Sequence, residues 1–73
     1  MPFSPRQTVA SSLIASLGYS SDAVLEIQFT TGAIYRYFTV PRSVYASFLA
    51  AQSKGLFFNR HIKPRFPSQR CDE

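Results

Sequence analysis

Apolar and polar residues alternate along the first half of the chain with the period of β-strands. In the first alternating segment the apolar side carries Leu13, Ala15, Leu17 and Tyr19. Ile14 falls on the opposite side, among small and polar residues. A second strand is expected over 24–29, and a third over 34–40, which is rich in β-branched and aromatic residues. Pro41 ends the predicted sheet because it has no N–H for a strand ladder.

The hydrophobic period becomes helical after Pro41, which can open a helix because its missing N–H would be unpaired there. One helix is expected through 44–51 and a second over 54–62, with Ser53 as its N-cap. The sequence therefore predicts an α+β fold, a three-stranded antiparallel sheet packed against two short C-terminal helices in the order β-β-β-α-α.

Prolines near both ends of the chain, and the lack of any hydrophobic periodicity there, indicate where the domain begins and ends. Residues 1–7 are expected to form a flexible N-terminal arm, and 8–67 a single domain. Residues 68–73 are expected to form a disordered C-terminal tail.

The turn between the second and third predicted strands decides where two conspicuous tyrosines point. A three-residue loop over 30–32 is favoured because only Gly32 then needs a positive φ, which a β-branched residue resists. The resulting pairs are Phe29 with Ala33, Ile27 with Tyr35, Leu25 with Tyr37 and Glu26 with Arg36. Tyr35 and Tyr37 are therefore expected on the apolar side, as core residues first and as a base-stacking platform second.

Charge is distributed unevenly along the chain, which has 73 residues and a net charge of +4. No acidic residue occurs between Ile27 and Cys71. The same stretch carries Arg36, Arg42, Lys54, Arg60, Lys63, Arg65 and Arg70. This basic half favours polyanions as partners.

The inventory of reactive side chains argues against an enzyme. With one histidine, one cysteine near the end and four acidic residues, no catalytic residues, metal site or cofactor are expected, and no small-molecule substrate. Cys71 is expected to be an incidental surface thiol, and His61 a partly buried core residue. No signal peptide or apolar span of ~20 residues is visible, so the chain is expected to be cytoplasmic, away from membranes.

Three ordered motifs resemble the KTSC domain family: IYRYFTVP at 34–41, SKGLFFN at 53–59, and Ile62–Lys63. The central Tyr-x-Tyr of the family matches Tyr35 and Tyr37, and the resemblance covers roughly residues 8 to 67. Departures from the expected pattern are Ser20, Pro64 and Phe66. The family is named for a module at the C-terminus of some lysyl-tRNA synthetases and also occurs as stand-alone bacterial proteins. The resemblance therefore implies an RNA-related role by analogy.

Two functions remain open from the sequence. The first is binding of structured RNA such as tRNA, with phosphates contacted by Arg42, Lys54, Arg60, Lys63 and Arg65. In that function Lys54 and Gly55 would offer a phosphate site at a helix N-terminus, and Tyr35 and Tyr37 would stack on bases. The favoured interpretation of Ser53, Lys54 and Gly55 is a plain N-cap followed by a glycine that makes room for packing. The alternative is protein–protein interaction or self-association through apolar residues on the second face of the sheet, such as Ile34 and Phe38.

Overall fold

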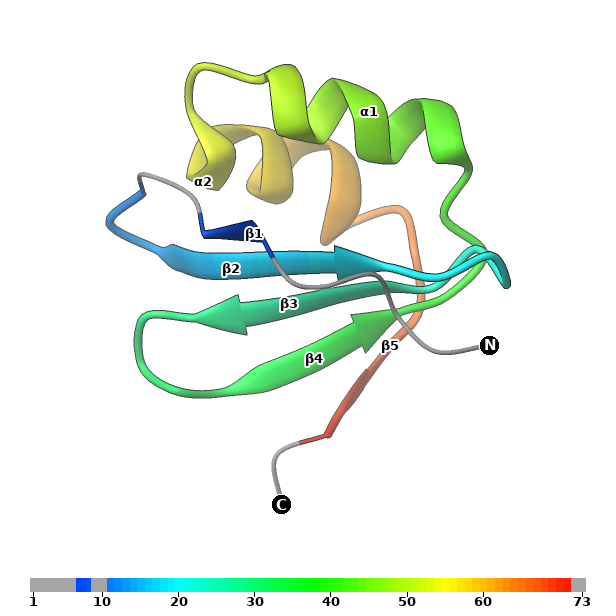
Figure 1. Cartoon of the computed structure of the whole chain (residues 1–73), viewed down its shortest axis with the longest axis horizontal. Helices are drawn as coiled ribbons and strands as arrows, with labels where there is room; N and C mark the ends of the chain where they lie inside the picture. The colour runs from blue at the N-terminus through cyan, green and yellow to red at the C-terminus, as the bar shows by residue number, and fades with distance from the viewer. Residues whose placement is uncertain (1–6, 9–10, 72–73) are drawn as a thin grey trace.

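The structure, a computed structural model, describes residues 7–8 and 11–71. In this part of the chain an antiparallel sheet has five strands in chain order, and a helical layer covers one of its faces (Figure 1). The strands are β1 (Gln7–Thr8), β2 (Ile14–Tyr19), β3 (Leu25–Phe29), β4 (Ile34–Tyr37) and β5 (Ser68–Arg70). The helical layer consists of α1 (Arg42–Ala50), α2 (Lys54–Phe57) and the π-helical turn η1 (Phe58–Ile62).

The α+β class, the antiparallel sheet and the two helical segments are confirmed, but the prediction of three strands is wrong. The additional strands, β1 and β5, lie at the two edges of the sheet. β5 falls in the segment expected to be a disordered tail, where three exposed residues give no hydrophobic alternation. Backbone hydrogen bonds with β4 hold this segment, and the Cys71 N–H donates to the Ile34 carbonyl at 2.7 Å.

The expected N-terminal arm is described only at its end, where Gln7 pairs with Leu17 of β2. Residues 1–6 and 72–73, which belong to the expected arm and tail, lie outside the described residues.

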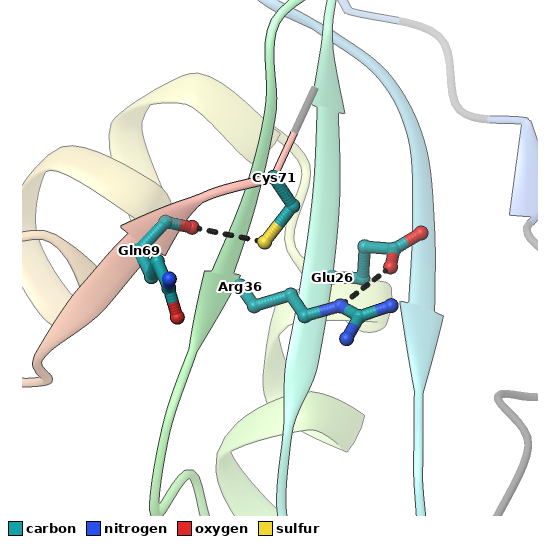
Figure 2. Close-up of polar contacts among 4 residues, drawn as sticks. All are labelled: Glu26, Arg36, Gln69 and Cys71. Carbon is teal, nitrogen blue, oxygen red and sulfur yellow. Dashed lines mark hydrogen bonds and ion pairs between the residues drawn. The ribbon is translucent and has the colours of Figure 1, made fainter. Parts of the chain in front are cut away.

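The predicted register of the β3–β4 hairpin is confirmed. Phe29 N–H donates to the Ala33 carbonyl at 2.9 Å, and Gly32 takes a φ of +97°. Leu25 pairs with Tyr37 and Ile27 with Tyr35, as expected. Glu26 lies opposite Arg36, whose Nε donates to the Glu26 carboxylate at 3.0 Å (Figure 2). The three-residue loop therefore directs both tyrosines to the helical side of the sheet.

β2 departs from the predicted alternation because it contains a bulge between Ile14 and Ser16. The extra residue shifts the pattern, so that Ile14 and Leu17 both lie in the core and are fully buried. The expectation that Ile14 would be on the polar side is therefore wrong.

β4 is shorter than predicted and ends at Tyr37 rather than at residue 40. Thr39 adopts a φ of 62°, which turns the chain out of the strand direction. Val40 N–H then donates to the Ala23 carbonyl at 2.8 Å, and the Val40 carbonyl accepts from the Tyr19 hydroxyl at 2.6 Å. These bonds position Pro41 as the N-cap of α1.

The core lies between the sheet and the helices. Its buried apolar residues are Ile14, Leu17, Tyr19, Leu25, Ile27, Tyr37, Val40, Phe48, Phe58 and Ile62. Ser53 is the N-cap of α2, as predicted, and its hydroxyl oxygen accepts from Leu56 N–H at 3.2 Å. The Lys63 N–H donates to the Phe58 carbonyl at 2.9 Å, which is the wider π-type spacing. Short π-helical turns of this kind are frequent at functional sites.

Candidate nucleic-acid interface

An open groove of about 640 Å³ lies between η1 and the β3–β4–β5 side of the sheet. We call it the tyrosine groove. Its aromatic wall consists of Phe29, Tyr35, Tyr37 and Phe58, and its polar rim of Asn59, Lys63 and Ser68. The groove is within the range of volumes typical of ligand sites, about 300–1,000 Å³.

The aromatic wall is held in place by edge-on ring contacts. The Phe58 ring meets Phe29 at a centroid distance of 5.2 Å and Tyr37 at 5.5 Å, with interplanar angles of 71° and 82°. Tyr35 is edge-on to Phe29 at 5.8 Å and lies 6.4 Å from Tyr37. Tyr37 is 5% exposed, whereas Tyr35 is only half-buried. Tyr37 is therefore part of the core, and Tyr35 retains accessible ring surface in the groove.

Burial favours the neutral form of the Tyr37 hydroxyl. Desolvation raises the pKa of Tyr37 above its ordinary value of 10.0. A hydrogen bond with Ser68 opposes this effect, and the neighbouring Tyr35 adds to it. The Tyr37 phenol therefore stays neutral at physiological pH, and its hydroxyl can donate or accept a hydrogen bond in the groove.

The polar rim comes from η1 and the start of β5. Asn59 and Lys63 are four residues apart, and both side chains are exposed and line the groove. Ser68 pairs with Tyr37 across the β4–β5 ladder, which brings its hydroxyl to the same groove. The groove therefore combines aromatic rings with an ammonium, an amide and a hydroxyl group.

The predicted site residues separate into groups. The structure brings Tyr35, Tyr37 and Lys63 together in the tyrosine groove. It places Arg60 and Arg65 outside the groove, in hollows on the other side of η1.

The remaining predicted residues lie elsewhere. The guanidinium of Arg42 lies 5.5 Å from the Tyr19 ring centroid. The Lys54 ammonium donates to the Ala51 carbonyl. Gly55 lies against Leu13, whose Cδ2 would be 3.5 Å from a Cβ added at the glycine. Lys54 therefore caps the C-terminal end of α1, and Gly55 has a packing role in α2, a helix of four residues.

Sequence reasoning missed two members of the polar rim of the groove. Ser68 falls in the segment expected to form a disordered tail, and no hydrophobic pattern marks its strand. Asn59 could have been found from its four-residue spacing to Lys63 on the predicted helix. His61 was expected to be partly buried, and this is wrong. Phe58 and Ile62 take the buried positions of η1, and His61 is exposed with its ring against Phe57 at 4.8 Å.

The second face of the sheet offers less apolar surface than expected. Val24, Ile34 and Phe38 are all half-buried rather than exposed. Cys71 is exposed at the end of β5, and its thiol donates to the Gln69 carbonyl at 3.3 Å (Figure 2).

The described residues also limit other kinds of site. Among them, no group of three or more His, Cys, Asp or Glu side chains is placed to hold a metal ion. No helix in the described ranges is long and apolar enough to cross a bilayer.

An antiparallel sheet covered on one face by two helical segments, with a tyrosine-lined groove at η1, defines a small α+β domain. The family model of the KTSC domain matches residues 10–66, and the chain belongs to this family. It is similar, with a TM-score of 0.90 and 41% identity, to the crystal structure of a KTSC domain protein from Yersinia pestis. That match covers 96% of this chain and 99% of the other.

Relatives by sequence occur in two settings. A protein from Tsukamurella paurometabola is 46% identical over 61 residues, which cover 82% of this chain and 91% of the relative. A protein from Stutzerimonas stutzeri is 43% identical over 61 residues, with 82% and 86% covered. A lysine–tRNA ligase from Nostoc punctiforme is 41% identical over 56 residues, which are 75% of this chain but 10% of the ligase. The same fold is therefore used alone and as a small part of a larger enzyme.

Proposed function

We propose that the domain binds RNA without catalysing a reaction, and that an unpaired stretch of the RNA occupies the tyrosine groove. The observation that carries the proposal is the combination of Tyr35, Tyr37 and Lys63 in one groove. Aromatic rings stack on bases of any sequence, and an ammonium on the rim contacts the adjoining phosphate. Tyr35 is the stacking residue in this arrangement because its ring is the more accessible of the two.

Electrostatics supports a polyanionic ligand. The described acidic residues are Asp22, in the turn between β2 and β3, and Glu26, which is paired with Arg36. Neither of them lines the groove. A net charge of +4 on 73 residues adds a long-range attraction for phosphate.

The relative from Nostoc punctiforme supports a tRNA-like ligand. The name of that protein describes the ligation of lysine to tRNA, and a segment similar to this chain forms part of it. Structured RNAs carry unpaired loops and ends, which are the regions that proteins read through stacking. Structured RNA with an accessible single-stranded region is therefore the proposed partner.

An amide-shift titration with total tRNA at two salt concentrations tests this function. We expect shifts at Tyr35, Asn59 and Lys63 that shrink as salt rises, because binding to phosphates releases counterions. If RNA causes no shifts there, RNA binding by the groove is refuted. Concentration-dependent broadening at Ile34 and Phe38 without RNA would indicate self-association through the second face instead.

A further inference from the structure

A second concave surface lies on the opposite side of η1 from the tyrosine groove. Two open hollows, of about 360 and 330 Å³, are both lined by Phe57 and His61. Arg60 lines the first hollow and Arg65 the second. We call this region, defined by these four residues, the helical surface.

The helical surface has a fixed aromatic base. Phe57 is stacked on the fully buried Phe48 at a centroid distance of 5.3 Å and an interplanar angle of 13°. The His61 ring lies over Phe57 at 4.8 Å with an angle of 46°. Phe48 anchors this stack to the core. The Phe57 and His61 rings between the two arginines are therefore already in place, and binding does not require the entropy cost of ordering them.

The charge of the helical surface is complementary to phosphate. Arg60 and Arg65 contribute guanidinium groups, which bind phosphate oxygens in a bidentate manner. Neither of the described acidic residues, Asp22 and Glu26, lines either hollow. Leu56, which is 49% exposed, adjoins Arg60 in the first hollow and adds apolar surface for a base or ribose.

The helical surface and the tyrosine groove meet at η1. Asn59 and Lys63 line the groove, whereas Arg60 and His61, from the same π-helical turn, line the helical surface. A strand that leaves the groove past Lys63 therefore encounters Arg60 when it crosses η1.

We propose that the helical surface binds the phosphate backbone of the same RNA whose unpaired bases occupy the tyrosine groove. This inference rests on the proposed function and extends it to a two-sided footprint around η1. Arg60 and Arg65 supply affinity that is independent of sequence, and the groove selects unpaired nucleotides.

Oligonucleotide length separates the two surfaces experimentally. Fluorescence anisotropy would compare a single-stranded tetranucleotide, chosen as a short probe for the groove, with a dodecanucleotide that is long enough to cross η1 as well. For the longer probe, Arg60→Ala and Arg65→Ala are each expected to reduce the slope of log K against log salt by about 0.7, the value for one phosphate contact with a single strand. For the tetranucleotide, both variants are expected to leave the slope unchanged.

Arg42→Ala is the matched control because it removes the same charge from an exposed arginine. The sequence predicts Arg42 as a phosphate contact, but the structure places it over Tyr19, where it lines neither the groove nor either hollow. It is expected to leave the slope of the longer probe nearly unchanged. An equal decrease in all three variants would overturn the inference in favour of a diffuse charge effect. An unchanged slope in the Arg60 and Arg65 variants would overturn it as well.

The outcomes distinguish the inference from the proposed function. If the tetranucleotide binds and shifts Tyr35 while the arginine variants behave as wild type, only the helical surface is refuted. If neither probe binds the wild-type chain, the proposed function fails. If a poly-glutamate peptide shifts the amides of Arg60 and His61 and RNA does not, the surface is specific for an acidic protein and the inference is overturned.

Discussion

The Phe58 ring meets the Tyr37 ring edge-on, with centroids 5.5 Å apart and ring planes at 82°. This contact fixes η1 to β4, although the two elements are separated in sequence by all of α1 and α2. Because Asn59 follows Phe58 directly and Lys63 follows one π-turn later, the same contact sets the polar rim above the aromatic wall of the groove.

Replacing Phe58 by leucine tests how far ring contacts stabilise this junction. The variant keeps an apolar side chain but loses the edge-on contacts with Phe29 and Tyr37, each worth about 0.5–1.5 kcal/mol. We expect the free energy of unfolding to fall by about 1–3 kcal/mol in urea titrations. Phe66→Leu, at a half-buried position packed on the same core, is the control and should cost less. Equal losses would contradict a special role for the Phe58 contacts.

Tyr35→Ala removes the accessible ring of the tyrosine groove. Stacking of one base contributes about 1–3 kcal/mol, so RNA affinity should fall about 5- to 150-fold. Tyr35→Phe keeps the ring and should retain most of the affinity, which separates stacking from hydrogen bonding by the hydroxyl. Anisotropy with a single-stranded oligonucleotide measures both variants. Wild-type affinity in Tyr35→Ala would contradict stacking at this position.

Lys63→Ala removes the ammonium from the rim of the groove. Binding should weaken to a similar extent for all RNA sequences, and the salt slope should decrease by about 0.7–1. Lys63→Arg retains the charge and should restore the slope. A sequence-dependent loss, or a slope that does not change, would show that Lys63 does not contact phosphate.

The raised pKa of Tyr37 predicts a loss of stability at alkaline pH. The folded-state pKa lies above the ordinary value of 10.0. The stability that the neutral Tyr37 phenol contributes is therefore complete below pH 10 and is lost as pH rises through the folded pKa. Tyr37→Phe should make the free energy of unfolding less dependent on pH above about 10. Burial also raises the pKa of Tyr45. Tyr45→Phe should therefore also make the free energy of unfolding less dependent on pH in the alkaline range. An identical pH dependence in wild type and Tyr37→Phe would contradict the burial effect.

Thr39 has a positive φ of 62°, which is unfavourable for a β-branched residue. Thr39→Gly should relieve about 1–2 kcal/mol of strain and lose about 0.4–1 kcal/mol through the more flexible unfolded chain. We therefore expect a net gain of about 0–1.6 kcal/mol in thermal or urea unfolding. Thr39→Val keeps both the β-branch and the strain and should not be stabilised. A less stable glycine variant would contradict this explanation.

The hairpin could be predicted because local stereochemistry determines it. Gly32 is the loop residue that tolerates positive φ, and the Glu26–Arg36 pair agrees with the register that this loop imposes. The Ser53 cap and the inward direction of Tyr37 could be predicted for similar reasons. In each case residues close in sequence, or paired through one turn, carry the information.

The parts that could not be predicted depend on partners distant in sequence. The β2 bulge turns Ile14 into the core between the sheet and the helical layer, and the local alternation of β2 does not encode it. β5 forms because its backbone pairs with the free edge of β4. The side chains of residues 68–70 show no hydrophobic alternation that would predict this strand. Since Ser68 lines the groove, the complete set of groove residues could be identified only from the structure.

Photocrosslinking tests the central claim most directly, because it maps bases onto residues. A single-stranded oligonucleotide containing 4-thiouridine would be irradiated with the wild-type chain, and the crosslinked peptides identified by mass spectrometry. Bases stacked in the tyrosine groove should crosslink to the β4 segment at Tyr35, and excess tRNA should suppress this product. Specific crosslinks confined to residues outside the groove, or an absence of crosslinks that competitor RNA can suppress, would contradict RNA binding at this site.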